Sequence, residues 1–171
     1  VNREYGLSVT GEHVIAGPGA KNFEQLFCEA FLNAGDGVLV FSPHFPTYPP
    51  NILRRSARVV LSQLKASNDF RPHLDDARRF LANDASPRAI FLNSPHNPTG
   101  GVLSKHVIEQ IAKIVAKHDQ LWVYSDEPYS KLVYDGPLAT IEAEPGMLER
   151  TVIVDCCSKT YAMPGWRLGY A

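Results

Sequence analysis

Two hydrophobic patterns alternate along the chain and predict strands interleaved with helices. Short apolar runs that end at polar or turn-forming residues are typical of buried strands. They cover residues 38–41, 58–64, 89–93, 121–126 and 151–155. Between them, apolar residues recur every three or four positions, as on one face of a helix. Three segments show this pattern: one follows the glycine-rich "AGPGAKN", one begins at His73, and one spans 106–118.

The first predicted helix has the clearest apolar face, and the segment after the strand that follows it has none. Its predicted inward residues are Phe23, Leu26, Phe27, Ala30 and Phe31, and the turn-forming residues 33–37 end it. By contrast, "SPHFPTYPP" at 42–50 contains four prolines and predicts a loop.

Strands that alternate with helices predict an α/β fold, a three-layer α/β/α sandwich with a mostly parallel sheet. In such sheets the ligand crevice lies beyond the carboxyl ends of the strands. The unusual residues of this chain follow four of the predicted strands, in "SPHF", "NSPHNPTG", "SDEPY" and "CCSK". We therefore expect one domain, residues 1–171, whose functional loops converge at one edge of the sheet.

Composition narrows the partners and the compartment. A formal net charge of -1 over 171 residues, without a basic run, disfavours binding to nucleic acid or to an anionic membrane surface. No apolar stretch approaches the roughly 20 residues needed to span a bilayer. Three cysteines without a CxxC motif and six scattered histidines indicate a reducing compartment, taken to be the cytoplasm, and no metal site. Because the chain begins without methionine and ends in an apparent strand, we expect it to be part of a longer protein.

Lys159 comes shortly after the last apolar run, so its ammonium is expected near the protein interior. A lysine in a low-dielectric site loses part of the stabilisation of its charged form, and its amine becomes available as a nucleophile or Schiff-base partner. The alternative is an ordinary lysine that reaches solvent.

Two further features indicate an anion site. The guanidinium of Arg167 is a bidentate clamp for phosphate, and the loop containing Gly19, Ala20 and Lys21 presents backbone N–H groups at a predicted helix N-terminus. A surface ion pair and a plain helix cap are the simpler interpretations.

Four residues could hold a flat heterocycle. Asp126 ends a strand and could keep a ring nitrogen protonated, while Tyr129 and Asn97 could donate to a ring oxygen and Phe45 could stack on the ring. A helix cap, a half-buried tyrosine, a proline turn and a core aromatic are the respective alternatives. Taken with the lysine and the anion loop, these residues predict a pyridoxal phosphate site.

The motifs "NSPHNPTG", "SDEPYSKLVYDG" and "SKTYAMPGWRLGY", in this order and at these separations, resemble those of class I/II aminotransferases with the aspartate aminotransferase fold. The resemblance runs over essentially the whole chain. It implies that residues 1–171 are the pyridoxal phosphate-binding large domain, cut at both ends and without the small C-terminal domain. It also implies a homodimer with amino acid and 2-oxo acid substrates, and cis peptides before Pro43 and Pro98.

The resemblance assigns roles to the same residues. Lys159 would form the Schiff base and move the substrate proton, and Asp126 would hold the pyridine nitrogen's proton. Asn97 and Tyr129 would bind the phenolic oxygen, and Phe45 would stack on the ring. The phosphate ligands would be Ala20 and Lys21 just after Gly19, together with Arg167.

One departure and two alternative functions remain. Three residues before the lysine the family usually has serine or glycine, whereas this chain has Cys156, a poorer donor to phosphate that Ser158 or water could replace. The same residues would also serve a β-lyase of this fold, or a non-catalytic sensor domain of a transcription regulator. A nucleotide-binding domain is disfavoured because no GxGxxG or P-loop motif is present.

Overall fold

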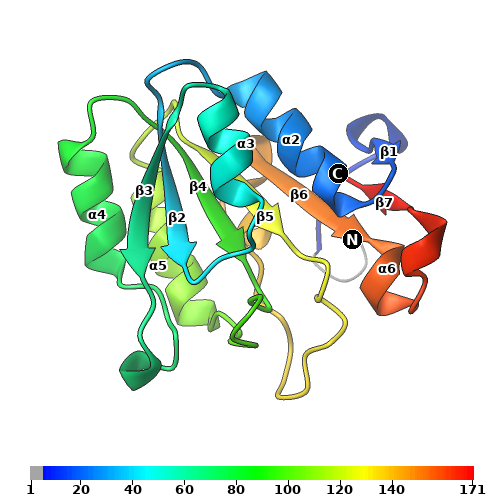
Figure 1. Ribbon diagram of the computed structural model, residues 1–171. Coiled ribbons are helices and arrows are strands. Elements are labelled where there is room, and N and C mark those ends of the chain that lie inside the picture. The colour runs from blue at the N-terminus through cyan, green and yellow to red at the C-terminus, as the bar shows by residue number, and fades with distance from the viewer. Residues whose placement is uncertain (1–5) are drawn as a thin grey trace.

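The computed structural model describes residues 6–171 and contains one seven-stranded sheet (Figure 1). The strands are β1 (Ala16–Gly17), β2 (Gly37–Ser42), β3 (Arg58–Gln63), β4 (Pro87–Asn93), β5 (Trp122–Asp126), β6 (Thr151–Cys156) and β7 (Gly169–Tyr170), in the order β1-β7-β6-β5-β4-β2-β3. The five strands from β6 to β3 pair in parallel, whereas β7 is antiparallel to both β6 and β1. The predicted mostly parallel sheet is confirmed.

Helices cover both faces of the sheet, as the α/β/α prediction requires. They are α2 (Ala20–Phe31), α3 (Tyr48–Arg54), α4 (Leu74–Asn83), α5 (Lys105–Val115) and the short α6 (Cys157–Thr160), with single 3₁₀ turns η1 (Gly11–His13), η2 (Ala66–Asn68), η3 (Ile141–Ala143), η4 (Leu148–Arg150) and η5 (Pro164–Trp166). α2 and α3 pack on one face, and α4 and α5 pack on the other (Figure 1).

An aromatic cluster joins α2 and α3 to the sheet. The rings of Phe91 and Tyr124 stack with centroids 4.6 Å apart, and Phe27 and Tyr48 meet Phe91 edge-on at 5.5 Å and 5.2 Å. Aromatic pairs of this kind contribute about 0.5–1.5 kcal/mol each beyond their burial. The cluster therefore holds both helices against β4 and β5.

Two local predictions are wrong. The last three residues of the proline-rich segment form the start of α3, because Pro49 and Pro50 lie in its first turn, where no intrahelical N–H partner is needed. In α2, Leu26 and Ala30 are exposed, and the buried face instead contains Glu24 and Cys28 with Phe23 and Phe27. The buried face of α2 is thus rotated, relative to the predicted one, so that it includes the acidic residue Glu24.

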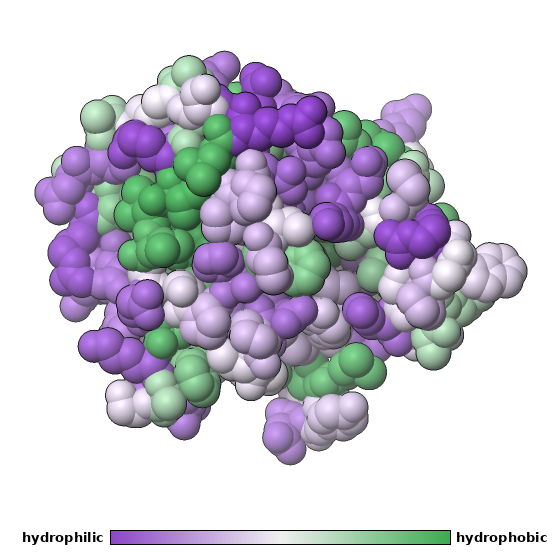
Figure 2. All heavy atoms as spheres, in the orientation of Figure 1, coloured by the Kyte–Doolittle hydropathy of each residue, from purple (hydrophilic) through white to green (hydrophobic). Residues whose placement is uncertain are grey.

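The face in Figure 2 mixes polar and apolar residues, and one of its apolar areas lies over the edge strand β3. There Leu61 is 52% exposed. Among residues 6–171, no helix has the length and apolar character to cross a membrane.

Candidate active site

The carboxyl ends of β2, β4, β5 and β6 lie at one edge of the sheet (Figure 1). The loops that follow them line a pocket of about 300 Å³. This volume is at the lower end of the range for small-molecule sites, roughly 300–1,000 Å³. The pocket brings together all the site residues predicted from sequence except Gly19, namely Ala20, Lys21, Phe45, Asn97, Asp126, Tyr129, Lys159 and Arg167. Gly19 adjoins them as the N-cap of α2.

One end of the pocket is built to approach an anion. Gly19 has φ +87°, and a Cβ at this position would collide with the guanidinium of Arg167. That guanidinium donates to the carbonyl oxygens of Pro18 at 3.3 Å and Pro164 at 3.1 Å, so it lies beside the N-terminus of α2. The first N–H groups of a helix, its positive dipole end and an arginine together suit a phosphate.

Asp126 gives the pocket a buried carboxyl group, in contrast to the anion-binding end. It ends β5, is 9% exposed, and accepts a hydrogen bond on Oδ2 from the Tyr48 hydroxyl at 2.5 Å. Burial raises the pKa of Asp126 to about 7, against the lowering effect of the Tyr48 hydrogen bond, and the charges of Glu24 and Asp155 raise it further. A protonated ring nitrogen beside this carboxyl would offset the cost of its burial.

Asn97 and Tyr129 form a hydrogen-bonded pair. Asn97 Nδ2 donates to the Tyr129 hydroxyl oxygen at 2.9 Å. Asn93 holds both loops, since its Oδ1 accepts from the Asn97 backbone N–H and its Nδ2 donates to the Asp126 carbonyl, each at 2.7 Å. Burial raises the pKa of Tyr129, so its phenol keeps the proton that it would donate.

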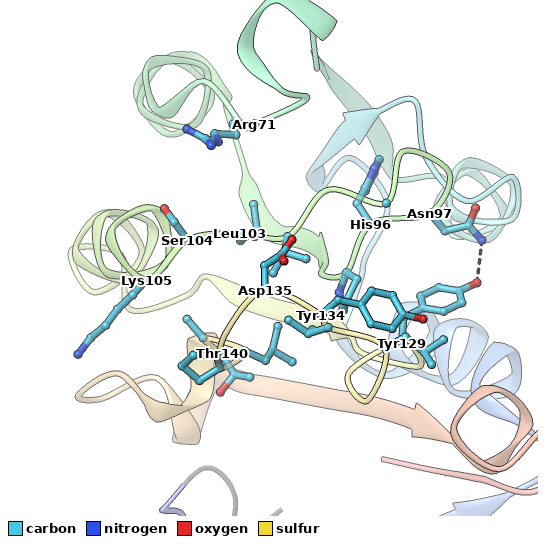
Figure 3. A pocket seen from close by; sticks show the side chains of 18 of the residues that line it. Arg71, His96, Asn97, Leu103, Ser104, Lys105, Tyr129, Tyr134, Asp135 and Thr140 are labelled. Carbon is cyan, nitrogen blue, oxygen red and sulfur yellow. Dashed lines mark hydrogen bonds between the residues drawn. The ribbon is translucent and has the colours of Figure 1, made fainter.

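The pair also borders a second, larger cavity of about 1100 Å³ (Figure 3). Asn97 and Tyr129 line both cavities. The other residues that line the larger cavity include Arg71, His96 and Tyr134.

Lys159 lies in the pocket wall, but the expectation of an interior ammonium is wrong. The side chain is exposed, and its Nζ lies 6.0 Å from the centroid of the Tyr129 ring. The reason is that β6 ends at Cys156 and the chain turns at once into α6, which carries Lys159 to the solvent-exposed rim.

The remaining sequence-predicted residues also face this pocket. Phe45 is half-buried and meets the Tyr48 ring edge-on at 6.0 Å. Cys156 and Ser158 are both buried and both line the pocket. The peptides before Pro43 and Pro98 are cis, as the resemblance implies, and so is the one before Pro95.

Sequence reasoning missed two residues of the site. Tyr48 holds Asp126 although 78 positions separate them, and Glu24 lines the pocket as a buried carboxylate. The sequence carries one signal for Glu24, because it shares the helical face of Phe27 and Cys28. No group of three or more His, Cys, Asp or Glu among residues 6–171 is arranged to hold a metal ion.

A family model described as "Aminotransferase class I and II" matches residues 1–171. The chain belongs to this family. Class I and II aminotransferases use pyridoxal phosphate, and the anion cradle, the buried carboxyl and the Asn97–Tyr129 pair fit that cofactor's phosphate, ring nitrogen and ring oxygen.

Similar proteins in the family carry transaminase names. The chain is 36% identical over 168 residues to the arginine–pyruvate transaminase of Pseudomonas aeruginosa, which covers 98% of this chain and 42% of that protein. It is 37% identical over 171 residues to the aspartate/prephenate aminotransferase of Thermus thermophilus, covering 99% of this chain and 43% of that protein.

Solved aminotransferase structures share the fold. The aromatic aminotransferase of Pyrococcus horikoshii superposes with a TM-score of 0.93 at 35% identity, over 99% of this chain and 45% of its own. An aspartate aminotransferase mutant of Thermus thermophilus gives 0.92 at 36% identity, over 99% and 43%. The chain thus spans about two fifths of the length of these aminotransferases.

Proposed function

We propose that this chain is the cofactor-binding part of a longer pyridoxal phosphate-dependent aminotransferase, which transfers an amino group between an L-amino acid and a 2-oxo acid. One observation carries the proposal. Five separate loops bring an anion cradle, a buried acid, a donor pair, an aromatic ring and a lysine to a single pocket. No simpler ligand class uses all five groups.

The residues divide the work by chemistry. Gly19, Ala20, Lys21 and Arg167 would bind the phosphate, and Phe45 would stack on the ring. Pyridoxal phosphate, when bound, supplies an aldehyde for the amino group and a ring that accepts electrons.

Three other groups would control protons. Asp126 would hold a proton on the ring nitrogen, and Asn97 and Tyr129 would orient the ring through its oxygen. Lys159 would bind the aldehyde carbon in the resting protein and then, as a free amine, move the proton between the substrate α-carbon and the cofactor C4′. Its position at the open rim suits this role because substrate must reach the same carbon.

The substrates and partners of the whole protein are proposed from its family. Named relatives use arginine with pyruvate, or aspartate. We propose the same general substrate classes, a homodimer and a cytoplasmic location.

Product analysis with the full-length protein tests this function. Amino acids are supplied with 2-oxo acids, and we expect a new amino acid to form in step with consumption of the oxo acid. Release of pyruvate and ammonia from one substrate would instead indicate a β-lyase, and cofactor binding without either product would indicate a sensor.

A further inference from the structure

Glu24 is a buried carboxylate with no role in the chemistry described above. It lies in the second turn of α2, is 1% exposed, and lines the pocket beside Lys21 and Phe45. A buried carboxylate is costly unless several donors satisfy it, so its hydrogen-bond partners indicate what it does.

Both oxygens of Glu24 are bonded to residues at the start of α3. Thr47 Oγ1 donates to Oε2 at 2.6 Å, and Asn51 Nδ2 donates to Oε1 at 2.6 Å. Thr47 is the N-cap of α3, and the backbone N–H of Asn51 bonds to the Thr47 carbonyl at 3.2 Å. The carboxylate therefore fastens the first turn of α3 to the helix whose N-terminus forms the anion cradle.

The residue held between these two contacts is Tyr48. It follows Thr47 directly and is buried, and its hydroxyl donates a hydrogen bond to Asp126 Oδ2. Phe45, the ring-stacking residue, lies two positions before the cap. One carboxylate thus connects three parts of the pocket: the anion end, the aromatic face and the acid.

We propose, resting on the proposed function, that Glu24 is a positioning residue for the cofactor. Through Thr47 and Asn51 it fixes the first turn of α3, so that Tyr48 stays on Asp126 and Phe45 stays over the ring. Glu24 binds α3 through these hydrogen bonds, and α3 in turn positions Asp126 through Tyr48.

Cofactor affinity of the full-length protein, measured by titrating pyridoxal phosphate, tests the proposal. We expect Glu24→Leu, which removes both acceptors, to weaken binding about tenfold, since hydrogen bonds to a charged group are lost. Glu24→Gln should retain most of the affinity, because its amide oxygen can accept from Thr47 and its NH₂ can donate to a reoriented Asn51. Glu29→Gln, an exposed change on the same helix, is the matched control.

A double-mutant cycle separates positioning from general stability. If Glu24 acts through Tyr48, Glu24→Leu should weaken binding at least about threefold less in a Tyr48→Phe background than in the wild type. Thr47→Val, which removes one donor, gives a second variant should Glu24→Leu not fold, with a loss of about threefold.

Three results would overturn the proposal while wild-type protein binds the cofactor. They are an unchanged affinity in both Glu24→Leu and Thr47→Val, effects that multiply independently in the cycle, or a Glu24→Gln variant as weak as Glu24→Leu. A wild-type protein that binds no pyridoxal phosphate would overturn the proposed function itself, and this inference with it.

Discussion

A carboxyl group buried as deeply as that of Asp126 makes stability depend on pH. Its pKa of about 7 lies above the ordinary 3.8, chiefly because burial disfavours the charged form. Below the ordinary value both folded and unfolded chains hold the proton, so nothing is lost. Between the two values the unfolded chain ionises first, and stability falls as pH rises until both forms are ionised.

We therefore expect Asp126→Asn to stabilise the cofactor-free protein at high pH. The gain in unfolding free energy should reach about 2–4 kcal/mol near pH 8 and vanish near pH 4, the upper figure being the full pKa difference. Chemical denaturation at both pH values measures it, with the exposed Asp119→Asn as control. An equal gain at both pH values would contradict the account.

Cys156 offers a gain-of-affinity prediction at the phosphate end. Replacing its thiol by a hydroxyl, in Cys156→Ser, should tighten pyridoxal phosphate binding about threefold to tenfold, the effect of one hydrogen bond. Cys157→Ser, at a half-buried residue outside the pocket lining, is the control. Unchanged affinity in Cys156→Ser would mean that Ser158, which also lines the pocket, already supplies the hydroxyl.

Among the elements, α2 and the segment carrying Arg167 must approach closely to make the anion cradle. We expect Gly19→Ala to weaken cofactor binding at least about tenfold, because φ is +87° and the added carbon displaces the guanidinium. Gly165→Ala is the matched control, since a Cβ there meets nothing within 4 Å and its φ is ordinary. Wild-type affinity in Gly19→Ala would rule out this cradle.

Outside the pocket lining, two buried acidic residues lie close together, one just after β5 and one in η3. Glu127 and Glu142 are both buried, and burial with mutual repulsion raises the pKa of Glu127 well above its usual range. Burial also raises the pKa of Glu142. Raised values mean that the pair destabilises the fold progressively as pH increases.

Glu142→Gln should relieve this repulsion. We expect an increase in unfolding free energy of about 1–3 kcal/mol near pH 8, and a smaller increase near pH 5, where the unfolded chain also begins to hold its protons. Thermal or chemical denaturation at the two pH values is the measurement, and the exposed Glu149→Gln is the control. A loss of stability at pH 8 would show that the pair is stabilising as it stands.

Element prediction from sequence succeeded where one pattern dominated and failed where two competed. The strands Gly37–Ser42 and Trp122–Asp126 were readable because each contains an unbroken apolar run, at residues 38–41 and 122–124. α3 was not, because prolines break most helices but are tolerated in a first turn. In α2 the pattern placed Leu26 inward, although Glu24 is buried there through partners from another helix.

At the scale of the whole molecule, the sequence predicted which loops meet but not how they are held. Parallel strands bring their carboxyl ends to one edge, so Asn97, Asp126 and Lys159 could be expected together. The Tyr48–Asp126 bond could not, because 78 residues separate its members and no local pattern links them. The exposure of Lys159 was also unreadable, since it depends on where β6 turns into α6.

The cofactor site is tested most directly by attaching pyridoxal phosphate to the full-length protein, followed by borohydride reduction and peptide mapping. We predict a visible absorbance band that reduction locks onto Lys159 and that Lys159→Ala lacks. Reduction onto another lysine with equal yield, or the same band in Lys159→Ala, would contradict the assignment of Lys159 as the lysine that binds the cofactor.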